Sequence, residues 1–343
     1  MSDKIVRADS NSSNITIQDV ADALGISKTT VSRAISGKGR IGAETKSKVL
    51  AYIEEYGYRP NPIAKSLADQ KSYNIAWVVP GDSSITDLPF FQKCMSGVIK
   101  TAEEAGYDVI ISMVYENDND SLKRLILNNK IDGVVLGRTL KNDINVKLLK
   151  AADFPFVCIG TTEQNGVIQI DNDHINACCE LTTMLIMKGI RNFVYIGGSD
   201  KHVVNETRKL GFEKAVKKHY AKGYNINTAV YMNADDAQSI DRILDNEMKN
   251  SAECIITADD KICRMVLDKL RNDRILVPDD IRVASFYQSE IISGNQPAIS
   301  TLKYEPEDLG AVATRVLLSY LQGEEVSEKT LLSYDILLKE STN

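Results

Sequence analysis

The sequence lacks the patterns that identify most enzymes and metal-binding proteins. No segment matches a phosphate-binding P-loop or the GxSxG pattern of serine hydrolases. The three histidines are scattered and the six cysteines show no CxxC spacing, which argues against a zinc site. Gly197-Gly198-Ser199 follows an expected strand but contains no lysine, so we interpret it as a tight turn. We therefore predict no enzymatic activity, no cofactor and no metal.

Long apolar runs are also missing. No window reaches the length of a membrane-spanning helix, and the first residues contain no apolar signal segment. Residues 1–14 are polar and rich in serine and asparagine, so we expect a disordered extension there. Most cysteines lie in apolar segments, which is typical of buried thiols in a reducing cytoplasm. We therefore expect a cytoplasmic protein without membrane contact.

Net positive charge is absent from the chain as a whole but present in one segment. The formal charge of −6 argues against a protein that coats nucleic acid with its entire surface. Residues 26–49, however, contain six basic residues and one acidic residue, a local charge of about +5. A basic segment on an acidic chain predicts contact with nucleic acid through one end only.

Residues 15–35 predict two short helices around a tight turn. Thr16 with Asp19 three residues later is typical of a capping box at a helix start. Gly25 stands where a helix end needs a left-handed residue, and Ser27 can cap the next helix. The second helix has a polar, cationic outer face. This is the pattern of a helix-turn-helix, whose second helix lies in the DNA major groove.

The continuation makes the motif more specific. A third helix is expected from Glu44 to Tyr56. Three segments begin at Thr16, Gly25 and Gly57: Thr-Ile-Gln-Asp-Val-Ala, Gly-Ile-Ser-Lys-Thr-Thr-Val-Ser-Arg and Gly-Tyr-Arg-Pro-Asn-Pro. Together they resemble the lactose-repressor and galactose-repressor (LacI/GalR) family of bacterial transcription regulators. The resemblance extends, more loosely, over nearly the whole chain.

From residue 73 short apolar strands alternate with amphipathic helices, which predicts parallel, doubly wound α/β sheets. There are too many strands for one open sheet, so we expect two lobes. The resemblance implies lobes of the periplasmic-binding-protein type behind an all-α helix-turn-helix head. It also implies three chain crossings between the lobes, near Asp171, Lys303 and Thr330. The last strand is expected at Leu331–Leu338.

The expected domain organisation follows from these patterns and from the resemblance. The extension at 1–14 precedes a DNA-binding domain at 15–59 and a hinge at 60–72. An effector-binding and dimerisation domain occupies 73–343. Its first lobe comprises about 73–171 and 304–329, and its second lobe comprises about 172–303 and 330–343.

The resemblance implies that the second helix of the head contacts base edges. The residues at the matching positions are Lys28, Thr29 and Arg33, and lysine or arginine can donate to guanine O6 and N7. The residues better suited to phosphate contacts are Thr16, Ser27, Thr30 and Ser32. The alternative is that Lys28 and Thr29 form only a solvated helix start.

The hinge segment predicts a helix that is too short to be stable alone. It runs over residues 61–68 with Pro62 in its first turn. The resemblance implies that two such hinges pair in a homodimer and enter the minor groove through Asn61, Ala64 and Leu67. In that arrangement Leu67 wedges between base pairs. The alternative is a flexible tether whose Leu67 packs on the neighbouring lobe.

Several residues match family positions that line a ligand cleft. Pro89-Phe90-Phe91 supplies aromatic side chains. The segment Arg208-Lys209-Leu210-Gly211-Phe212 supplies an arginine that grips a ligand hydroxyl or carboxylate. The implied effector-binding residues are Phe90, Phe91, Arg208, Asp259 and Tyr287.

The sequence departs from the sugar-responsive pattern at three of these places. Gly160 follows the strand ending at Ile159 where a carboxylate is usual, Tyr287 replaces an aspartate, and Asp259 replaces an asparagine. Two strong acceptors for vicinal hydroxyls are therefore missing. Tyr287 either stacks on a ring of the effector or plugs the cleft. The effector is accordingly a sugar, another small molecule, or none.

The leading hypothesis is a dimeric, sequence-specific transcription regulator, a repressor by the family default. It would bind a palindromic DNA operator and respond to a small-molecule effector. The alternative is a two-lobed solute-binding protein or enzyme that does not regulate DNA. The missing signal segment argues against the first of these, and the missing catalytic motifs argue against the second.

Overall fold

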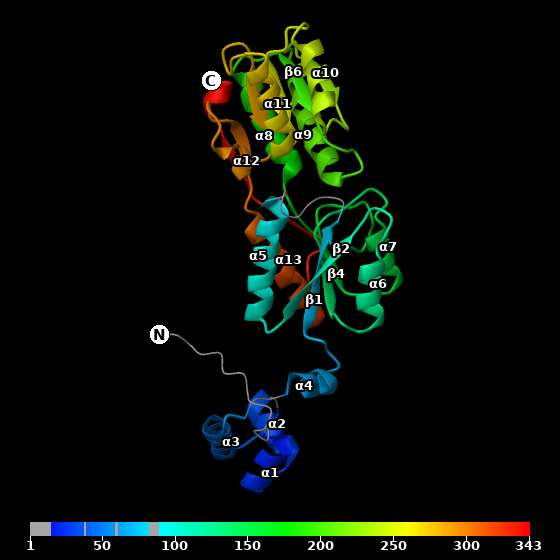
Figure 1. Cartoon of the computed structure of the whole chain (residues 1–343), viewed down its shortest axis with the longest axis vertical. Helices are drawn as coiled ribbons and strands as arrows, with labels where there is room; N and C mark the ends of the chain where they lie inside the picture. Colours follow the sequence, from blue (N-terminus) through cyan, green and yellow to red (C-terminus); the bar gives the residue numbers. More distant parts are fainter. Residues whose placement is uncertain (1–14, 38, 59–60, 82–88) are drawn as a thin grey trace. The chain divides into compact units, whose positions relative to one another are not determined.

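A computed structural model describes residues 15–37, 39–58, 61–81 and 89–343 (Figure 1). The expected disorder at 1–14 lies outside the described residues, as do Lys38, Arg59 and Pro60. The chain divides into two compact units, Met1–Lys71 and Ser72–Asn343.

The first unit is a set of short helices around a small apolar core. Its helices are α1 (Ile17–Leu24), α2 (Lys28–Ser36), α3 (Ala43–Tyr56) and α4 (Pro62–Asp69). The buried core consists of Val20, Ala21, Val31, Ala34, Val49 and Tyr58. Each of α1, α2 and α3 contributes to this core, so the two helices of the helix-turn-helix are held against the third.

The turn between α1 and α2 is fixed by the capping residues that the sequence predicts. The Thr16 hydroxyl accepts a hydrogen bond from the Asp19 amide at 3.3 Å, and the Asp19 carboxylate accepts one from the Thr16 amide at 2.8 Å. Gly25 ends α1 in the left-handed region at φ 62°. The Ser27 hydroxyl accepts from the Thr30 amide at 3.1 Å and starts α2.

Gly37, Gly39 and Gly42 match the GxGxxG spacing of dinucleotide-binding loops. That motif requires a strand before the loop, whereas this segment joins α2 to α3. Gly37 and Gly39 have positive φ of 68° and 90°, which other residues rarely adopt. The glycines therefore serve the connection between two helices and do not form a nucleotide site.

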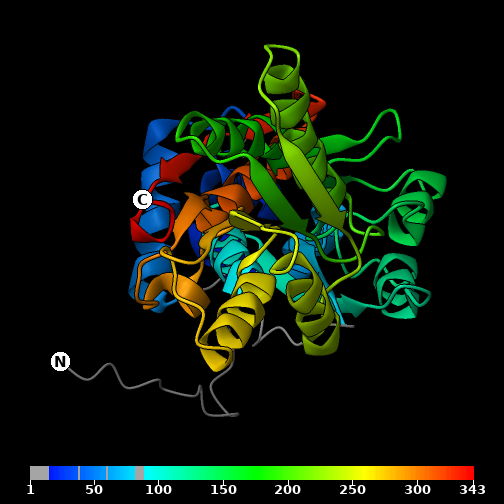
Figure 2. The ribbon, with the colours of Figure 1, turned by 90° about the horizontal axis from the view of Figure 1, so that it is seen from above.

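The second unit contains two six-stranded sheets, each with helices on both faces (Figures 1 and 2). The first sheet is parallel throughout, in the order β11-β5-β4-β3-β1-β2. Its strands are β1 (Asn74–Pro80), β2 (Asp108–Val114), β3 (Gly133–Leu136), β4 (Phe156–Ile159), β5 (Ile168–Asn172) and β11 (Lys329–Leu332). The helices of this first lobe are α5 (Pro89–Glu104), α6 (Asp120–Leu127), α7 (Ile144–Ala151) and α13 (Pro306–Leu321).

The second sheet repeats this arrangement in the order β12-β10-β9-β8-β6-β7, with only β12 antiparallel. Its strands are β6 (Asn192–Ile196), β7 (Asn227–Tyr231), β8 (Cys254–Thr257), β9 (Arg282–Ser285), β10 (Ser300–Lys303) and β12 (Asp335–Leu337). The helices are α8 (His174–Met187), α9 (Val203–Tyr220), α10 (Ala237–Glu247), α11 (Asp260–Asn272) and α12 (Glu290–Ser293), with a terminal 3₁₀ turn at Glu340–Thr342. Ligands of doubly wound folds bind outside the carboxyl ends of the parallel strands.

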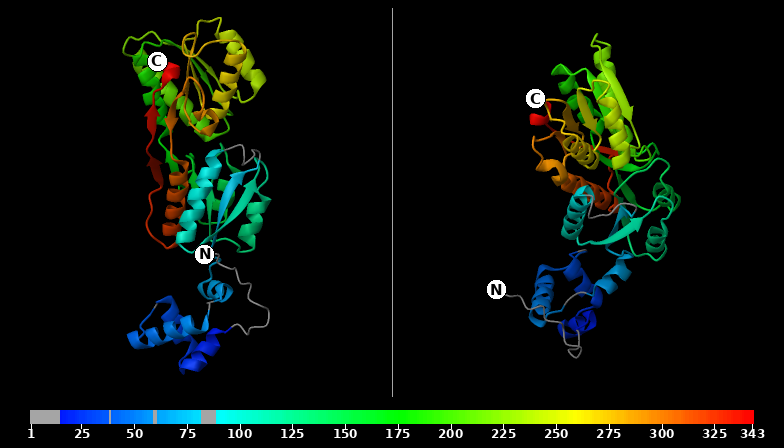
Figure 3. Two further views of the ribbon diagram at one scale, coloured as in Figure 1. Left: turned by 60° about the vertical axis from the view of Figure 1, so that its left-hand side comes forward. Right: turned by 45° about the horizontal axis from the view of Figure 1, so that its top comes forward.

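The chain passes between the lobes after β5, between β10 and α13, and between β11 and β12. The single strand expected at Leu331–Leu338 is wrong, because β11 belongs to the first sheet and β12 to the second. Thr330 pairs with Ile170 inside the first sheet, so the third crossing lies beyond it, at residues 333–334. A chain that leaves one sheet edge and joins another stays extended, so its apolar pattern does not reveal the change. Figure 3 shows these C-terminal strands running from the first lobe to the second.

The first lobe depends on a close helix pair, α5 against α13. A Cβ atom added to Gly97 would lie 1.9 Å from the Glu307 carbonyl oxygen, and one added to Gly310 would lie 2.1 Å from the Cys94 carbonyl oxygen. Only glycine allows the two backbones to approach this closely. The pair covers one face of the sheet beside the fully buried Trp77. It also fixes the start of α5, which supplies Phe90 and Lys93 to the space between the lobes.

Candidate nucleic-acid interface and ligand cleft

The outer face of α2 is polar, cationic and free of the apolar core. Val31 and Ala34 are buried on the inner side of the helix. The four residues on the outer side are all exposed: Lys28, Thr29, Ser32 and Arg33. Because Ser27 caps the helix and the core holds its inner side, this face is presented on a fixed backbone.

The residues expected to contact phosphate differ in whether their hydroxyl groups are already hydrogen-bonded within the protein. The Thr16 hydroxyl is engaged with Asp19, and the Ser27 hydroxyl lies 2.9 Å from that of Thr30. Three of the four hydroxyl groups therefore already stabilise helix starts. Ser32 alone of this group lies on the outer face of α2.

The hinge segment forms the helix α4. Asn61, just before this helix, and Ala64, within it, are both exposed. The side chain of Leu67 is 82 % exposed, the highest value for a large apolar residue in the described part of the chain. The Lys71 amide donates to the Ser66 carbonyl at 3.1 Å and closes the end of this helix. The helix therefore presents one bare leucine to solvent.

Arg208 is positioned by the packing of α9 on α8. A Cβ atom at Gly211 would lie 2.6 Å from the Ile175 carbonyl oxygen, so glycine is needed for this approach. The next residue, Phe212, is buried and stacks on Tyr195 with ring centroids 5.3 Å apart. This explains the Arg-x-x-Gly-Phe spacing, which lets the second lobe hold the arginine at its edge in a buried position.

Tyr287 is the partner of Arg208. It follows β9, where the buried Ser285 hydroxyl donates to its carbonyl at 2.8 Å. The Arg208 guanidinium lies 5.7 Å from the centroid of the Tyr287 ring, within the range of a cation–π contact. Tyr287 stacks in turn on Tyr304, with centroids 6.3 Å apart, and is only 6 % exposed. The structure therefore brings these expected residues together.

Phe90 comes from the first lobe and closes this group from the other side. Its ring meets the Tyr287 ring edge to face at 6.1 Å, and it packs against the cores of both lobes. Phe91 contacts Phe90 at 5.3 Å but otherwise belongs to the core of the first lobe. Of the two aromatic residues, Phe90 is the one at the lobe boundary.

Asp259 has a structural task in this arrangement. Its carboxylate accepts a hydrogen bond from the Ile262 amide at 2.8 Å and so caps α11. Burial raises the pKa of this carboxyl group, and the nearby Arg208 guanidinium acts in the opposite direction. Among the described residues no ion pair joins Asp259 to Arg208. Asp259 thus lies close to the arginine without neutralising it directly.

Residues that the sequence did not single out surround the same place. His174 lies 4.9 Å from Tyr304, ring to ring, and 3.3 Å from the Asp171 carboxylate. Several buried polar atoms here have no hydrogen-bond partner: Asn172 Oδ1, His174 Nδ1, Tyr195 OH, Arg208 Nε and Tyr304 OH. Tyr304 was missed because the strand before it, β10, is short and has little apolar pattern.

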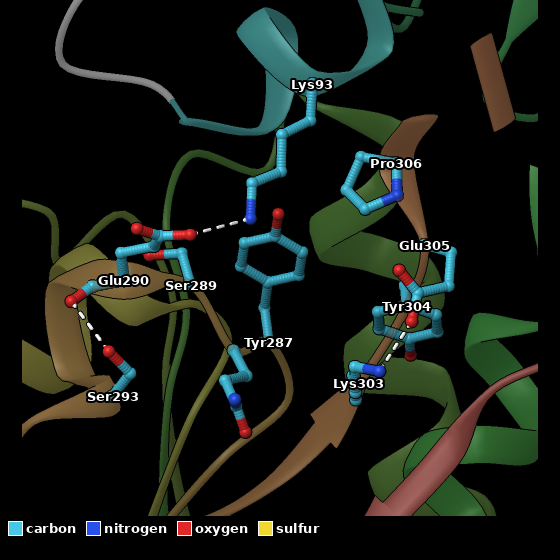
Figure 4. Close-up of a pocket in the computed structure, with 10 residues that line it drawn as sticks. Lys93, Tyr287, Ser289, Glu290, Ser293, Lys303, Tyr304, Glu305 and Pro306 are labelled. Atoms are coloured by element: carbon cyan, nitrogen blue, oxygen red, sulfur yellow. Dashed lines mark hydrogen bonds and ion pairs between the residues drawn. The ribbon is translucent and has the colours of Figure 1, made fainter. Parts of the chain in front are cut away.

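A small pocket of about 150 Å³ adjoins the cleft. It is lined by Tyr287, Tyr304 and several charged residues, and Figure 4 shows Lys93 extending from α5 toward Glu290 on α12 beside the Tyr287 ring. The Lys93 ammonium and the Glu290 carboxylate are 2.9 Å apart and link the two lobes. The charges in this pocket are therefore balanced within the protein.

A second set of contacts joins the lobes elsewhere. The Lys141 amide donates to the Lys201 carbonyl at 2.9 Å, and the Lys201 ammonium lies 2.7 Å from Glu116. The Lys141 ammonium lies 3.5 Å from Glu206 at the start of α9. These groups are largely exposed, so solvent screens each ion pair and its contribution to stability is small. Together with the Phe90–Tyr287 contact they hold the lobes against each other.

Two regions of the chain match known protein families. Residues 16–61 match the DNA-binding region of the bacterial regulatory proteins of the lacI family. Residues 182–342 match the periplasmic-binding-protein-like domain. The chain belongs to the LacI family. The family resemblance stated from the head motifs, and the fold class of a helical head with a two-sheet α/β body, are thereby confirmed.

Relatives of this LacI-family chain match it almost end to end. Catabolite control protein A of Priestia megaterium is 26% identical over 339 residues, which is 96% of this chain and 99% of that protein. The HTH-type transcriptional regulator MalR of Staphylococcus xylosus is 27% identical over 342 residues, 96% of this chain and 98% of that protein. These relatives are transcription regulators, and so is this family member.

Solved structures share the fold. The Lac repressor dimer bound to operator and the anti-inducer ONPF superposes with a TM-score of 0.77 at 22% identity, over 96% of this chain and 99% of that one. The transcriptional regulator CelR in complex with cellobiose gives a TM-score of 0.67 at 24% identity, over 95% and 99% of the two chains. Within the described residues, no helix combines the length and the apolar character needed to cross a bilayer.

Proposed function

We propose that this LacI-family regulator binds a two-fold symmetric operator as a homodimer, with α2 in the major groove and α4 in the minor groove. The observation that supports this proposal is the exposed cationic face of α2, which is held on a capped helix over a buried core. Lys28, Thr29 and Arg33 contact base edges, and Ser32 contacts the phosphate backbone. Thr16, Ser27 and Thr30 mainly hold the helix starts that aim this face.

The domain roles follow from the same arrangement. The head at about 15–59 reads DNA, the hinge at about 60–72 pairs with its copy, and the body carries dimerisation and the ligand cleft. The edge strand β2 supports a body-to-body contact. Ile111 and Met113 alternate along it and so share one face, and Tyr115 follows its last residue; the three are 49%, 41% and 48% exposed. A second copy of the chain would cover them.

A small molecule bound between the lobes modulates DNA binding in this proposal. Arg208, Tyr287 and Phe90 form its site, and a ligand there would change how the lobes meet. The lobes carry the hinges, so the ligand alters hinge pairing and hence operator affinity, a coupling between two sites. The structure of CelR in complex with cellobiose supports a small-molecule effector, and sugars are the first class to test. Repression by occupying the operator is the default mode.

The test of DNA recognition is a fluorescence-anisotropy titration of the full chain with palindromic duplexes selected from random DNA. We expect specific binding to fall steeply with salt, because lysine and arginine displace counterions from phosphates. Arg33→Ala should cost about 1–3 kcal/mol and relax base preference at one position per half-site. Arg124→Ala, an exposed arginine of α6 in the body, is the matched control and should leave affinity unchanged.

Two results would contradict the proposal. One is equal affinity for selected and scrambled duplexes at physiological salt. The other is a monomeric protein, by analytical ultracentrifugation, at concentrations that saturate the operator. A charged replacement on β2, Met113→Lys, should weaken both self-association and operator binding, because a buried unpaired charge opposes the dimer.

A further inference from the structure

Residues 70–73, the joint between the hinge helix α4 and the first strand of the body, include two residues in a rarely adopted backbone conformation. Gln70 has a φ of 52° and Tyr73 a φ of 55°, and neither is a glycine or an asparagine, which adopt such angles most readily. Residues stay in this region only where their surroundings hold them, and such positions concentrate at functional sites. The contacts of the joint therefore show what holds it.

The carboxylate of Asp132 holds the second half of the joint. Its Oδ1 accepts hydrogen bonds from the Ser72 amide at 2.7 Å and from the Ser72 hydroxyl at 2.8 Å. Its Oδ2 accepts a hydrogen bond from the Tyr73 amide at 2.9 Å. Hydrogen bonds to a charged acceptor are roughly twice as strong as those between neutral groups. One side chain therefore fixes the backbone of two consecutive residues.

Tyr73 is attached to the first lobe by further contacts. Its carbonyl accepts a hydrogen bond from the Asp108 amide at 2.9 Å, and its ring centroid lies 5.5 Å from that of the buried Tyr107. The Asp132 amide donates in turn to the Asn74 carbonyl at 2.7 Å. These partners lie at the starts of β1, β2 and β3, which are neighbours in the sheet. The joint is therefore held by the amino ends of three strands.

This position separates the joint from the ligand cleft. Ligands of doubly wound sheets bind outside the carboxyl ends of the strands, and the joint is attached to the opposite ends. The amides of Ser72 and Tyr73 precede the paired residues of β1, which begin at Asn74, so the sheet ladder does not supply their acceptors. Asp132 supplies them instead. Its carboxylate is thus placed to act on the chain that leaves for the hinge, and not on a ligand.

A fixed joint matters because the hinge is short. The helix α4 has 8 residues, Pro62–Asp69, and a helix of this length is unstable alone in water. In the proposed function it is ordered by pairing with its copy on DNA. Each residue that becomes ordered only at that step weakens binding, because its conformational entropy is lost then. Asp132 orders Ser72 and Tyr73 before DNA binds, in both subunits of the dimer.

We propose that Asp132 is a positioning residue for operator binding, which holds Ser72 and Tyr73 so that each hinge starts from a fixed point of the first lobe. The inference rests on the proposed function in one respect, that paired hinges contact the operator. It adds the residue that links the first lobe to the hinge. A movement of that lobe then moves the start of the hinge with it, because the joint does not yield between them.

The first measurement uses the full chain without DNA. Hydrogen–deuterium exchange, followed by mass spectrometry, reports the Ser72 and Tyr73 amides in Asp132→Asn, which keeps one acceptor oxygen and loses the charge. Exchange of these amides should become at least about tenfold faster while β1 stays protected. Asp279→Asn, at an exposed aspartate before β9 in the second lobe, is the matched control and should change neither amide. Unchanged exchange in Asp132→Asn would overturn the proposal.

The second measurement compares a selected palindromic duplex with a scrambled one by fluorescence anisotropy. Asp132→Asn should bind the palindrome at least about tenfold less tightly, because two residues of each subunit are then ordered only on binding. The scrambled duplex is held by charge and needs no paired hinges, so its affinity should stay the same. A general folding defect would weaken both complexes. An equal loss on both duplexes, or no loss on the palindrome, contradicts the role of Asp132.

Two further variants test whether Asp132 acts through the hinge. Two glycines inserted between Lys71 and Ser72 leave the Asp132 contacts in place but loosen the connection, and should lower palindrome affinity in the same way. This variant also decides the question if Asp132→Asn does not fold. In Leu67→Ala, which lacks the expected wedge, adding Asp132→Asn should cost less than it does in the unmodified chain. Full affinity after the insertion, or additive losses in the double variant, would remove Asp132 from the hinge pathway.

Failure of this inference and failure of the proposed function appear in different samples. An unmodified chain that binds both duplexes equally contradicts the proposed function, whatever Asp132 does. An unmodified chain that prefers the palindrome, with a preference that Asp132→Asn retains in full, leaves the regulator intact and rejects the positioning role.

Discussion

Phe90 of the first lobe and Tyr287 of the second meet edge to face, with ring centroids 6.1 Å apart. This contact lies beside Arg208, which is expected to bind a ligand. Tyr287 belongs to the core of the second lobe, and Phe90 packs against the cores of both lobes. Any ligand that enters between the lobes must therefore compete with, or stack upon, an aromatic contact already made within the chain. In this structure the Tyr287 ring is buried against Phe90, and its stacking on a ring of the effector stays a prediction.

A double-mutant cycle measures this contact. Phe90→Leu and Tyr287→Leu should each destabilise the body in urea unfolding, and together by less than their sum. The coupling should be about 0.5–1.5 kcal/mol, the range of edge-to-face aromatic pairs. The control cycle combines Tyr287→Leu with Leu127→Ala, a distant, 79 % exposed leucine on α6, and should be additive. Additive effects in both cycles would show that the rings do not meet in solution.

Leu67 tests the hinge. Leu67→Ala should lower operator affinity at least tenfold and reduce DNA bending measured by resonance energy transfer, because an apolar wedge kinks the minor groove only when it is large enough to unstack a base step. Leu127→Ala removes an equally exposed leucine from the body and should change neither quantity. The proteins should unfold at the same temperature, since neither side chain is buried. An unchanged bend angle in Leu67→Ala would exclude the wedge.

The glycine contacts between α5 and α13 predict a stability effect far from any ligand. Gly97→Ala and Gly310→Ala each place a methyl group against a backbone carbonyl and should cost about 1–3 kcal/mol of the free energy of unfolding, or more. Gly294→Ala is the control, because nothing lies within 4 Å of its added Cβ and its φ is −91°. Chemical denaturation followed by circular dichroism measures all three. Equal stability of the variants would mean that the helices can separate without loss.

The cysteines predict a dependence on alkaline pH. All six are buried without disulfides, and burial raises the pKa of Cys263 to about 12. The unfolded thiol ionises near pH 8.5, so its neutral form favours the folded state fully below that pH. This stabilisation is lost as pH rises from about 8.5 toward 12. Cys263→Ala should reduce the alkaline loss of stability, as measured by urea unfolding between pH 7 and pH 10.

The same burial makes the thiols reporters of unfolding. At pH 8 a thiol reagent such as 5,5′-dithiobis(2-nitrobenzoate) should react with none of the six in the native chain and with all six in denaturant. Fast reaction of one thiol in the native protein would show that its helix opens locally. Cys94 is the informative position, because it lies at the contact between α5 and α13.

The head could be predicted from sequence because its signals are local. The capping box of Thr16 and Asp19, the left-handed Gly25 and the Ser27 cap each act within four residues, and the structure shows all of them. The alternation of strands and helices in the body is equally local, since it depends on periodicity along each element. Neither the head motifs nor this alternation could be predicted only by knowing which elements pack together; both are visible in the sequence alone.

The sequence by itself therefore determined the helix-turn-helix and the α/β class of the body, and the family resemblance singled out Arg208 with a glycine three residues later. Only the tertiary structure decided that Asp259 is a helix cap, that Tyr304 faces the cleft, and that the final residues span two sheets. These facts depend on which distant segments meet. The free energy of such contacts comes from burial and pairing between elements, which a linear pattern does not record.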